Sequence, residues 1–322
     1  MKTLSTTFLD NFSSREIHNG MEEILTLYAK DVLGDKQIDK LRLRYHDMKK
    51  NFDNVTHDAL PNYKNADEWV FSEGIRPHGR EADGSYYQDT SSVPIPVTHH
   101  LFRHLRTDFI KKHKEAGHQI DGAVLGLDLP IWFNLSSKNK IMIVAQDPLR
   151  NPKWYYECNA AICSSPFGQH GREHREKGGK RFSLLINNLV DNGYGVYLTD
   201  CYKYYLCGWS VTDGKKIKSP LTKDVEILRA YHDIILKEIS IVEPTVIVTM
   251  GNVARNALNN ILAKDNLTIL NLPHFSGAAQ GRILQSTAFH HIKANIGLPI
   301  DDNSTIAQAK VFTYAICNNK AF

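Results

Sequence analysis

The stretch Lys140-Ile-Met-Ile-Val-Ala-Gln-Asp-Pro148 is a short apolar run that passes directly into a polar loop. Its first half, Ile141 to Ala145, has the length and β-branched content expected of a buried strand. Proline has no backbone N–H, so Pro148 ends that strand. In an open α/β sheet, ligands bind beyond the carboxyl ends of the strands. Asp147 is therefore a candidate general base, although an aspartate before a proline also caps turns.

Three more apolar runs predict strands at 194–200, 245–249 and 267–272, with helical periodicity between them. The helices are expected at 181–192, 222–241 and 252–264. Strands that alternate with helices pair in parallel and carry helices on both faces. We therefore expect an α/β protein whose residues 138–322 form a three-layer α/β/α domain with a four-stranded parallel central sheet. Pro220 and Thr222 supply start signals for the long middle helix, and Gly193 supplies a stop signal for the helix before it.

Residues 1–137 have a different pattern of apolar residues, glycine and proline, which predicts a helical and loop-rich N-terminal extension. Apolar residues recur at three- and four-residue spacing up to about residue 60, whereas glycine and proline interrupt the segment 61–96. The segment 98–118 is a helix candidate with several histidines, arginines and lysines. Its basic residues could face phosphates, but a solvated helix face is the more common use of such a pattern.

Composition describes an ordinary globular protein of 322 residues, 42% hydrophobic and 23% charged. The formal charge of +4 is compatible with a polyanionic partner but does not require one. The start of the chain lacks the apolar core of a signal peptide, and no run approaches the length of a membrane span. The five cysteines show no paired spacing, which favours reduced thiols. We expect a cytoplasmic monomer that does not associate with membranes.

Each predicted strand ends in a polar loop, and parallel strands bring these loops to one edge. The first loop carries Gln146 and Asp147, the second Asp200, and the fourth His274. A histidine alone is more often structural than catalytic. Opposite a carboxylate at the edge of a sheet, however, His274 is a candidate for catalysis.

Two short motifs at these loops resemble the uracil-DNA glycosylase superfamily. The first motif of the bacterial and human uracil enzymes reads Gly-Gln-Asp-Pro-Tyr-His-Gly-Pro, and residues 145–152 read Ala-Gln-Asp-Pro-Leu-Arg-Asn-Pro. The second family motif begins His-Pro-Ser, and residues 274–277 read His-Phe-Ser-Gly. The segment Ser165-Pro-Phe-Gly168 also resembles the family segment that carries a stacking aromatic. The resemblance covers about residues 138–296 and leaves 1–137 unexplained.

The resemblance implies hydrolysis of the bond between a base and its sugar after the base has been flipped out of the stack. Asp147 would orient or deprotonate the attacking water, and His274 would donate a hydrogen bond to the departing base. Phe167 would stack on the base, which the Gln146 loop would help to enclose, and Ser276 would hold a flanking phosphate. No metal and no cofactor is expected.

Three positions depart from the family pattern. The family asparagine that reads uracil aligns with Asp200, whose ionised carboxylate only accepts hydrogen bonds and would favour a base edge with an amino group. A protonated Asp200 could partly imitate the amide. The family tyrosine that excludes the methyl group of thymine aligns with Leu149, and the motif proline aligns with Phe275. The target base is therefore left open.

Two further features bear on partners. The segment 169–181 holds five lysine and arginine residues, among them Arg172, Arg175 and Lys180, against two glutamates. It follows the first site loop, so it either contacts the DNA backbone or is an exposed loop. The cysteines lack the spacing of the iron–sulfur cluster that some members carry, so no cluster is expected.

The sequence thus predicts a DNA glycosylase that removes uracil or another deaminated or modified base from single- or double-stranded DNA. Two alternatives stay open. A catalytically inactive nucleic-acid-binding protein would hold a base on the same fold without cleaving it. A small-molecule nucleoside hydrolase would cleave free nucleosides and would show no salt-dependent affinity for DNA.

Overall fold

A computed structural model describes residues 19–53, 79–80, 86–87, 93–148, 160–168, 179–212, 216–218, 224–262, 267–274 and 280–321. The central sheet has five strands in the order β12-β11-β6-β8-β5. Their bounds are Thr268–Leu272, Val246–Met250, Lys140–Ala145, Gly195–Asp200 and Ile131–Phe133, in that order. The first four are parallel neighbours, and β5 pairs antiparallel with β8.

The predicted α/β class is confirmed, but the predicted four-stranded parallel sheet is wrong because β5 adds an antiparallel edge strand. At three residues, β5 is too short to be recognised from periodicity. The four parallel strands themselves begin and end within one residue of the predicted bounds.

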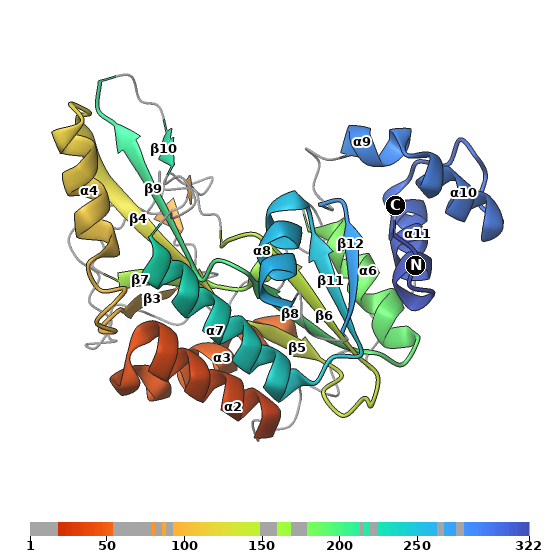
Figure 1. Cartoon of the computed structure of the whole chain (residues 1–322), viewed down its shortest axis with the longest axis horizontal. Coiled ribbons are helices and arrows are strands. Elements are labelled where there is room, and N and C mark those ends of the chain that lie inside the picture. Colours follow the sequence, from red (N-terminus) through yellow and green to blue (C-terminus); the bar gives the residue numbers. More distant parts are fainter. Residues whose placement is uncertain are drawn as a thin grey trace.

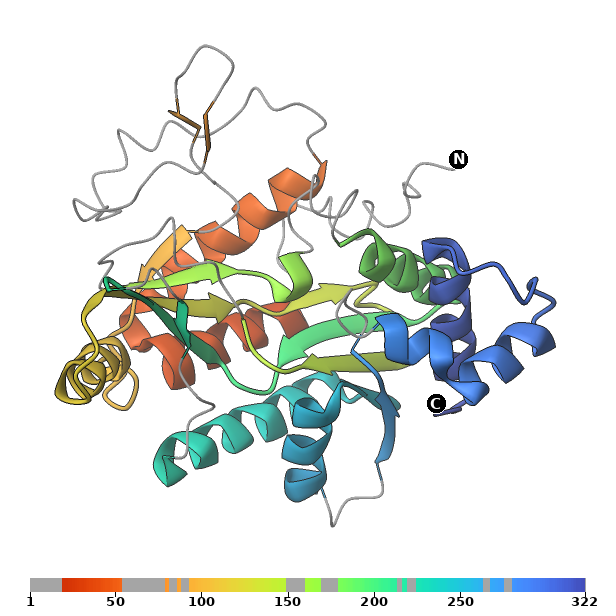
Figure 2. The ribbon, with the colours of Figure 1, turned by 90° about the horizontal axis from the view of Figure 1, so that it is seen from above.

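Helices cover both faces of this sheet and make it a three-layer structure (Figure 2). The helices α7, Val225–Val242, and α8, Asn252–Leu262, lie on one face, and α6, Lys180–Asp191, lies on the other. The helix α7 begins after Asp224, whose carboxylate accepts from the backbone N–H groups of Glu226 and Ile227. The cap is thus two residues beyond Thr222, the nearer of the two predicted start signals. Gly193 ends the turn after α6 with a φ of +85°, as the stop signal predicts.

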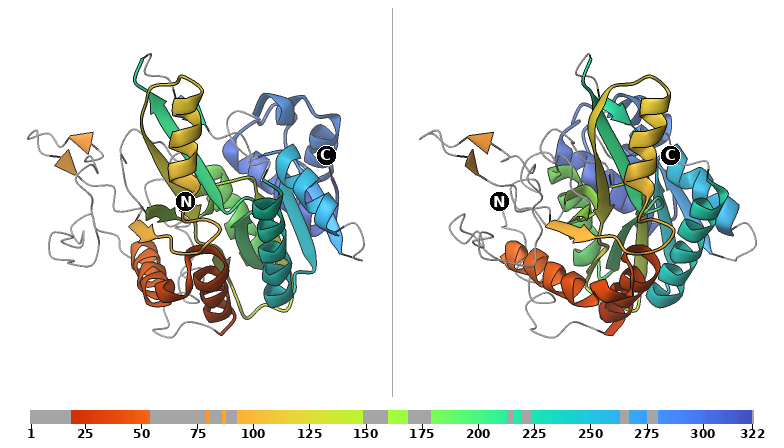
Figure 3. Two further views of the ribbon diagram at one scale, coloured as in Figure 1. Left: turned by 60° about the vertical axis from the view of Figure 1, so that its left-hand side comes forward. Right: turned by 90° about the vertical axis from the view of Figure 1, so that its left-hand side faces the viewer.

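A second five-stranded sheet, in the order β10-β9-β4-β7-β3, stands beside the first (Figure 1). Its strands are Lys216–Lys218, Tyr204–Ser210, Ile120–Asp128, Ala160–Ser164 and Val93–Pro96, in that order. The helix α4, Leu105–Glu115, packs beside β4 and β9 in both views of Figure 3. The helix expected over 98–118 is therefore shorter, and the second sheet is not predicted from the sequence at all.

The N-terminal region packs against the part of the chain beyond residue 137. The helix α2, Asn19–Tyr28, continues as a π-helical turn, Ala29–Leu33, and contacts α7. A 3₁₀ turn, Asp35–Gln37, leads into α3, Ile38–Asp53, and short strands β1, Gly79–Arg80, and β2, Tyr86–Tyr87, pair with each other. Because β3, β4 and β5 pair with strands from beyond residue 137, both sheets contain chain from both sides of it. The domain boundary at 137/138 stays a prediction.

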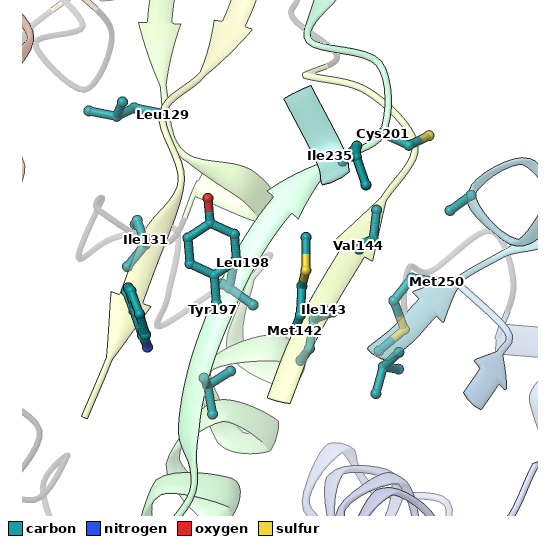
Figure 4. Packing of buried hydrophobic residues seen from close by; sticks show 14 of the residues in the cluster. Leu129, Ile131, Met142, Ile143, Val144, Tyr197, Leu198, Cys201, Ile235 and Met250 are labelled. Carbon is teal, nitrogen blue, oxygen red and sulfur yellow. The ribbon is translucent and has the colours of Figure 1, made fainter. Parts of the chain in front are cut away.

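The chain ends in three helices: α9, Gln280–Gln285, α10, Thr287–Asn295, and α11, Thr305–Cys317, which packs on α6. Side chains from β5, β6, β8, β11 and α7 fill the middle of the molecule (Figure 4). Among them, Met142, Ile143 and Leu198 are fully buried, as a strand covered on both faces requires. In the part of the chain described here, no helix is both long and apolar enough to cross a membrane.

Candidate active site

The loop after β6 holds Gln146 and Asp147 in mutual contact. The Gln146 side-chain amide donates from Nε2 to Oδ2 of Asp147 at 2.6 Å, and both residues are half-buried. Hydrogen bonds from the residues that follow β8 hold the backbone of this loop. The N–H of Cys201 donates to the Ala145 carbonyl at 2.9 Å, and the N–H of Tyr202 donates to the Gln146 carbonyl at 3.0 Å. A carboxylate in such a loop is held in one place, which suits a group that must orient a water.

Asp200 ends the next strand and lies directly opposite Ala145 in the β6–β8 register. Its side chain is buried, with 4% of its surface exposed. The two aspartates therefore come from the carboxyl ends of neighbouring parallel strands, as the alternation of strands and helices predicts.

His274 follows β12 by two residues, beside the turn that ends β11. The N–H of Gly251 donates to the Leu272 carbonyl at 2.8 Å, which joins the ends of these two strands. Gly251 has a φ of +91°, and a Cβ built on it would lie 3.4 Å from Cβ of His274. Burial lowers the pKa of His274 below 6.5. The imidazole is therefore neutral near pH 7, a state that keeps one N–H donor and one acceptor.

Phe167 is brought to His274 by the short 3₁₀ turn Pro166–Gly168. The two ring centroids are 5.8 Å apart, and the rings are inclined at 50°. Phe167 also stacks on Phe182 of α6, with ring centroids 3.6 Å apart. Its backbone has a φ of 55°, a left-handed conformation that costs a residue with a side chain about 1–3 kcal/mol. Strain of this kind gathers at binding and catalytic sites, where packing holds the residue in place.

The structure thus brings the predicted residues together as two contacting pairs, Gln146 with Asp147 and Phe167 with His274, and aligns Asp200 beside the first pair. Lys180 is half-buried at the start of α6. The remaining predicted residues, Leu149, Arg172, Arg175 and Ser276, lie outside the described residues. The roles of all these residues stay predictions.

Several residues around these loops were not predicted. Lys203 and Glu238 form a buried ion pair at 2.8 Å behind the end of β8. A signal for Glu238 was present, because it continues the apolar stripe of α7 that contains Ile227, Tyr231 and Ile234. No local pattern marks Lys203, since the carboxylate that pairs with it, Glu238, lies in a distant part of the chain. Within the described residues, no three histidine, cysteine or acidic side chains are grouped as a metal site would require.

Taken together, fold and site define an α/β protein with an aspartate, a neutral histidine and a strained aromatic at or beside the carboxyl edge of a parallel sheet. A family model, uracil DNA glycosylase superfamily, matches residues 133–295, about half of the chain. The chain belongs to the uracil-DNA glycosylase superfamily, which confirms the resemblance stated from its motifs. No curated protein matches the sequence.

Proposed function

We propose that this protein is a DNA glycosylase that hydrolyses the N-glycosidic bond of uracil or of another deaminated or modified base in DNA. The observation that carries the proposal is the position of Asp147 and His274 at the carboxyl ends of β6 and β12, in a chain of this superfamily. Family membership supports chemistry on DNA, and the two side chains supply the groups that the reaction needs.

Breaking the bond between C1′ and the base nitrogen leaves positive charge on the sugar and the electron pair of the bond on the base. In the proposed reaction, the Asp147 carboxylate stabilises the cationic sugar and orients the water whose oxygen attaches to C1′. One proton of this water passes to the carboxylate, and a proton then returns through solvent to the released base. The neutral imidazole of His274 donates its N–H to the base oxygen on which negative charge develops. Phe167 stacks on the flipped base, with Gln146 and Leu149 beside it.

Asp200 determines which base fits. A buried carboxylate at the carboxyl end of β8 accepts hydrogen bonds and repels a carbonyl oxygen, so its ionised form favours a base edge that carries an amino group. A protonated Asp200 would instead donate to a carbonyl oxygen, as the family asparagine does. The candidate substrates therefore include cytosine-like modified bases as well as uracil.

Contacts with the DNA backbone would come from Ser276 and from the basic segment 169–181. Arg172, Arg175 and Lys180 would each neutralise a phosphate and release a counterion. Replacing one of them by alanine should then reduce the salt dependence of DNA affinity by about one counterion.

Base release from oligonucleotides with uracil, hypoxanthine, xanthine or modified cytosine, single- and double-stranded, tests the proposal. The wild-type chain should release at least one base. Asp147→Asn should lose that release and still bind DNA, whereas Asp191→Asn, at an exposed aspartate that ends α6, should change neither. DNA binding without release of any base would overturn the proposal in favour of an inactive binding protein. Cleavage of free nucleosides, with no salt-dependent DNA affinity, would identify a nucleoside hydrolase.

A further inference from the structure

A buried ionic network lies directly behind the carboxyl end of β8. The Lys203 ammonium is 1% exposed and donates each of its three N–H bonds to a different acceptor. These are Oε2 of Glu238 at 2.8 Å, Oγ1 of Thr199 at 2.9 Å and the backbone carbonyl of Asp200 at 2.7 Å. The last contact joins the network to the residue predicted to read the base.

Glu238 of α7 accepts hydrogen bonds from hydroxyl groups of two other elements. Its Oε1 accepts from Tyr28 of α2 at 2.8 Å, and from Tyr197 and Thr199 of β8, both at 2.9 Å. Burial raises the pKa of both tyrosines well above 10, so both hydroxyls stay protonated and donate. A buried charge pair with such complete hydrogen bonding is rigid, since any movement would leave a buried charge unsatisfied.

The turn that carries Lys203 also holds the loop of Asp147. Its residues Cys201 and Tyr202 donate their N–H groups to the carbonyls of Ala145 and Gln146, and Sγ of Cys201 lies 3.2 Å from the Gln146 carbonyl. One turn therefore connects the network to both candidate carboxylates. Stability alone does not account for an ion pair here, because apolar side chains of similar volume are often at least as stable in a protein core.

We propose that Lys203 and Glu238 are positioning residues for base release, which fix the turn 200–203 and through it the carboxylates of Asp200 and Asp147. This inference rests on the proposed glycosylase function. It also gives the N-terminal region a part in the site, because Tyr28 of α2 supplies one of the hydroxyl groups that Glu238 holds.

The test uses the double variant Lys203→Met/Glu238→Gln in the full chain. Removing both charges together leaves no unpaired buried ion, and the glutamine keeps an oxygen for the tyrosine and threonine hydroxyls. The matched control is Lys293→Met. Lys293 of α10 is equally buried and donates to the Ile300 carbonyl at 2.6 Å, away from the turn 200–203.

The double variant should fold, and its kcat for base release should fall about 10²-fold with little change in KM, because the reacting groups lose their alignment. The amide hydrogens of Cys201 and Tyr202 should exchange faster than in wild type. Lys293→Met should show neither effect once both variants are compared at equal folded fraction. An unchanged kcat, or an equal fall in the control, would overturn the inference.

Hydrogen exchange at the amides of Cys201 and Tyr202 tests the positioning role without requiring any base release. If the wild-type chain releases no base, the proposed function fails, and exchange at Cys201 and Tyr202 still decides whether the network holds the turn. Unchanged exchange in the double variant would overturn the positioning role.

Discussion

His274 carries a prediction about pH, because burial lowers its pKa below 6.5. If the neutral imidazole is the donor to the departing base, the limb of the kcat/KM profile that depends on His274 should lie below pH 6.5, because kcat/KM reports the pKa values of the free enzyme. The resonance of its Cε1 proton should titrate at the same pH, and His274→Gln should remove both signals. A His274 that titrates above 6.5, with kcat/KM rising as it becomes charged, would contradict this role.

The same shift has a consequence for stability. Between the lowered pKa and 6.5, the unfolded chain binds more protons at this histidine than the folded chain does. The contribution of His274 to the free energy of unfolding is therefore complete above pH 6.5, and it is lost as pH falls from 6.5 to the lowered pKa. His274→Gln should flatten this part of the stability profile in chemical denaturation.

Asp200→Asn should shift the base preference toward uracil. The amide donates to a carbonyl oxygen where the ionised carboxylate repels it, and one well-placed pair of hydrogen bonds discriminates between bases by about 1–3 kcal/mol. We expect the ratio of kcat/KM for uracil to that for amino-bearing pyrimidines to rise about 5- to 160-fold. Asp128→Asn is the matched control, since Asp128 is also buried at a strand end, in the second sheet. An unchanged ratio would show that Asp200 does not read the base.

At the level of elements, the turn from β11 to α8 should be sensitive to a single methyl group. Gly251→Ala places a side chain at a φ of +91°, which costs about 1–2 kcal/mol, and brings the new Cβ into contact with Cβ of His274, 3.4 Å away. We expect lower stability and lower base release. Gly193→Ala is the matched control, with a φ of +85° and no atom within 4 Å of the added Cβ. It should lose similar stability in thermal denaturation and keep its activity per folded molecule. Equal activity loss in both variants would rule out a local effect on His274.

The elements that the sequence predicted are those with a strong local signal. The four parallel strands are apolar runs between helical stretches, so periodicity defines them. The second sheet is different, because its strands are short or contain glycine and proline, as in Val93-Pro-Ile-Pro96 at its edge. Its pairings also join distant segments, such as β4 with β9, and no local pattern specifies them.

The same limit applies to the site. Asp147, Asp200 and His274 were found because parallel strands bring residues at their carboxyl ends to one edge. The contact of Phe167 with His274, and the network around Glu238, depend on packing between elements that are far apart in the sequence. Only the apolar stripe of α7 indicated that Glu238 faces the core.

For the whole molecule, the packing predicts that the N-terminal helices and the central sheet unfold together. One core runs from Met21 to Ile316, Tyr28 binds Glu238, and the hydroxyl of Tyr204 donates to the Val32 carbonyl at 3.0 Å. Hydrogen exchange along a denaturant series should give residues 19–33, 140–145 and 195–200 one common midpoint. Tyr28→Phe removes a hydrogen bond to a buried charge, worth about 1.5–3 kcal/mol, and should lower all three midpoints equally. Tyr314→Phe, a half-buried tyrosine of α11, should lower them less. Loss of protection in 19–33 while both strands stay protected would instead indicate an N-terminal unit that folds independently.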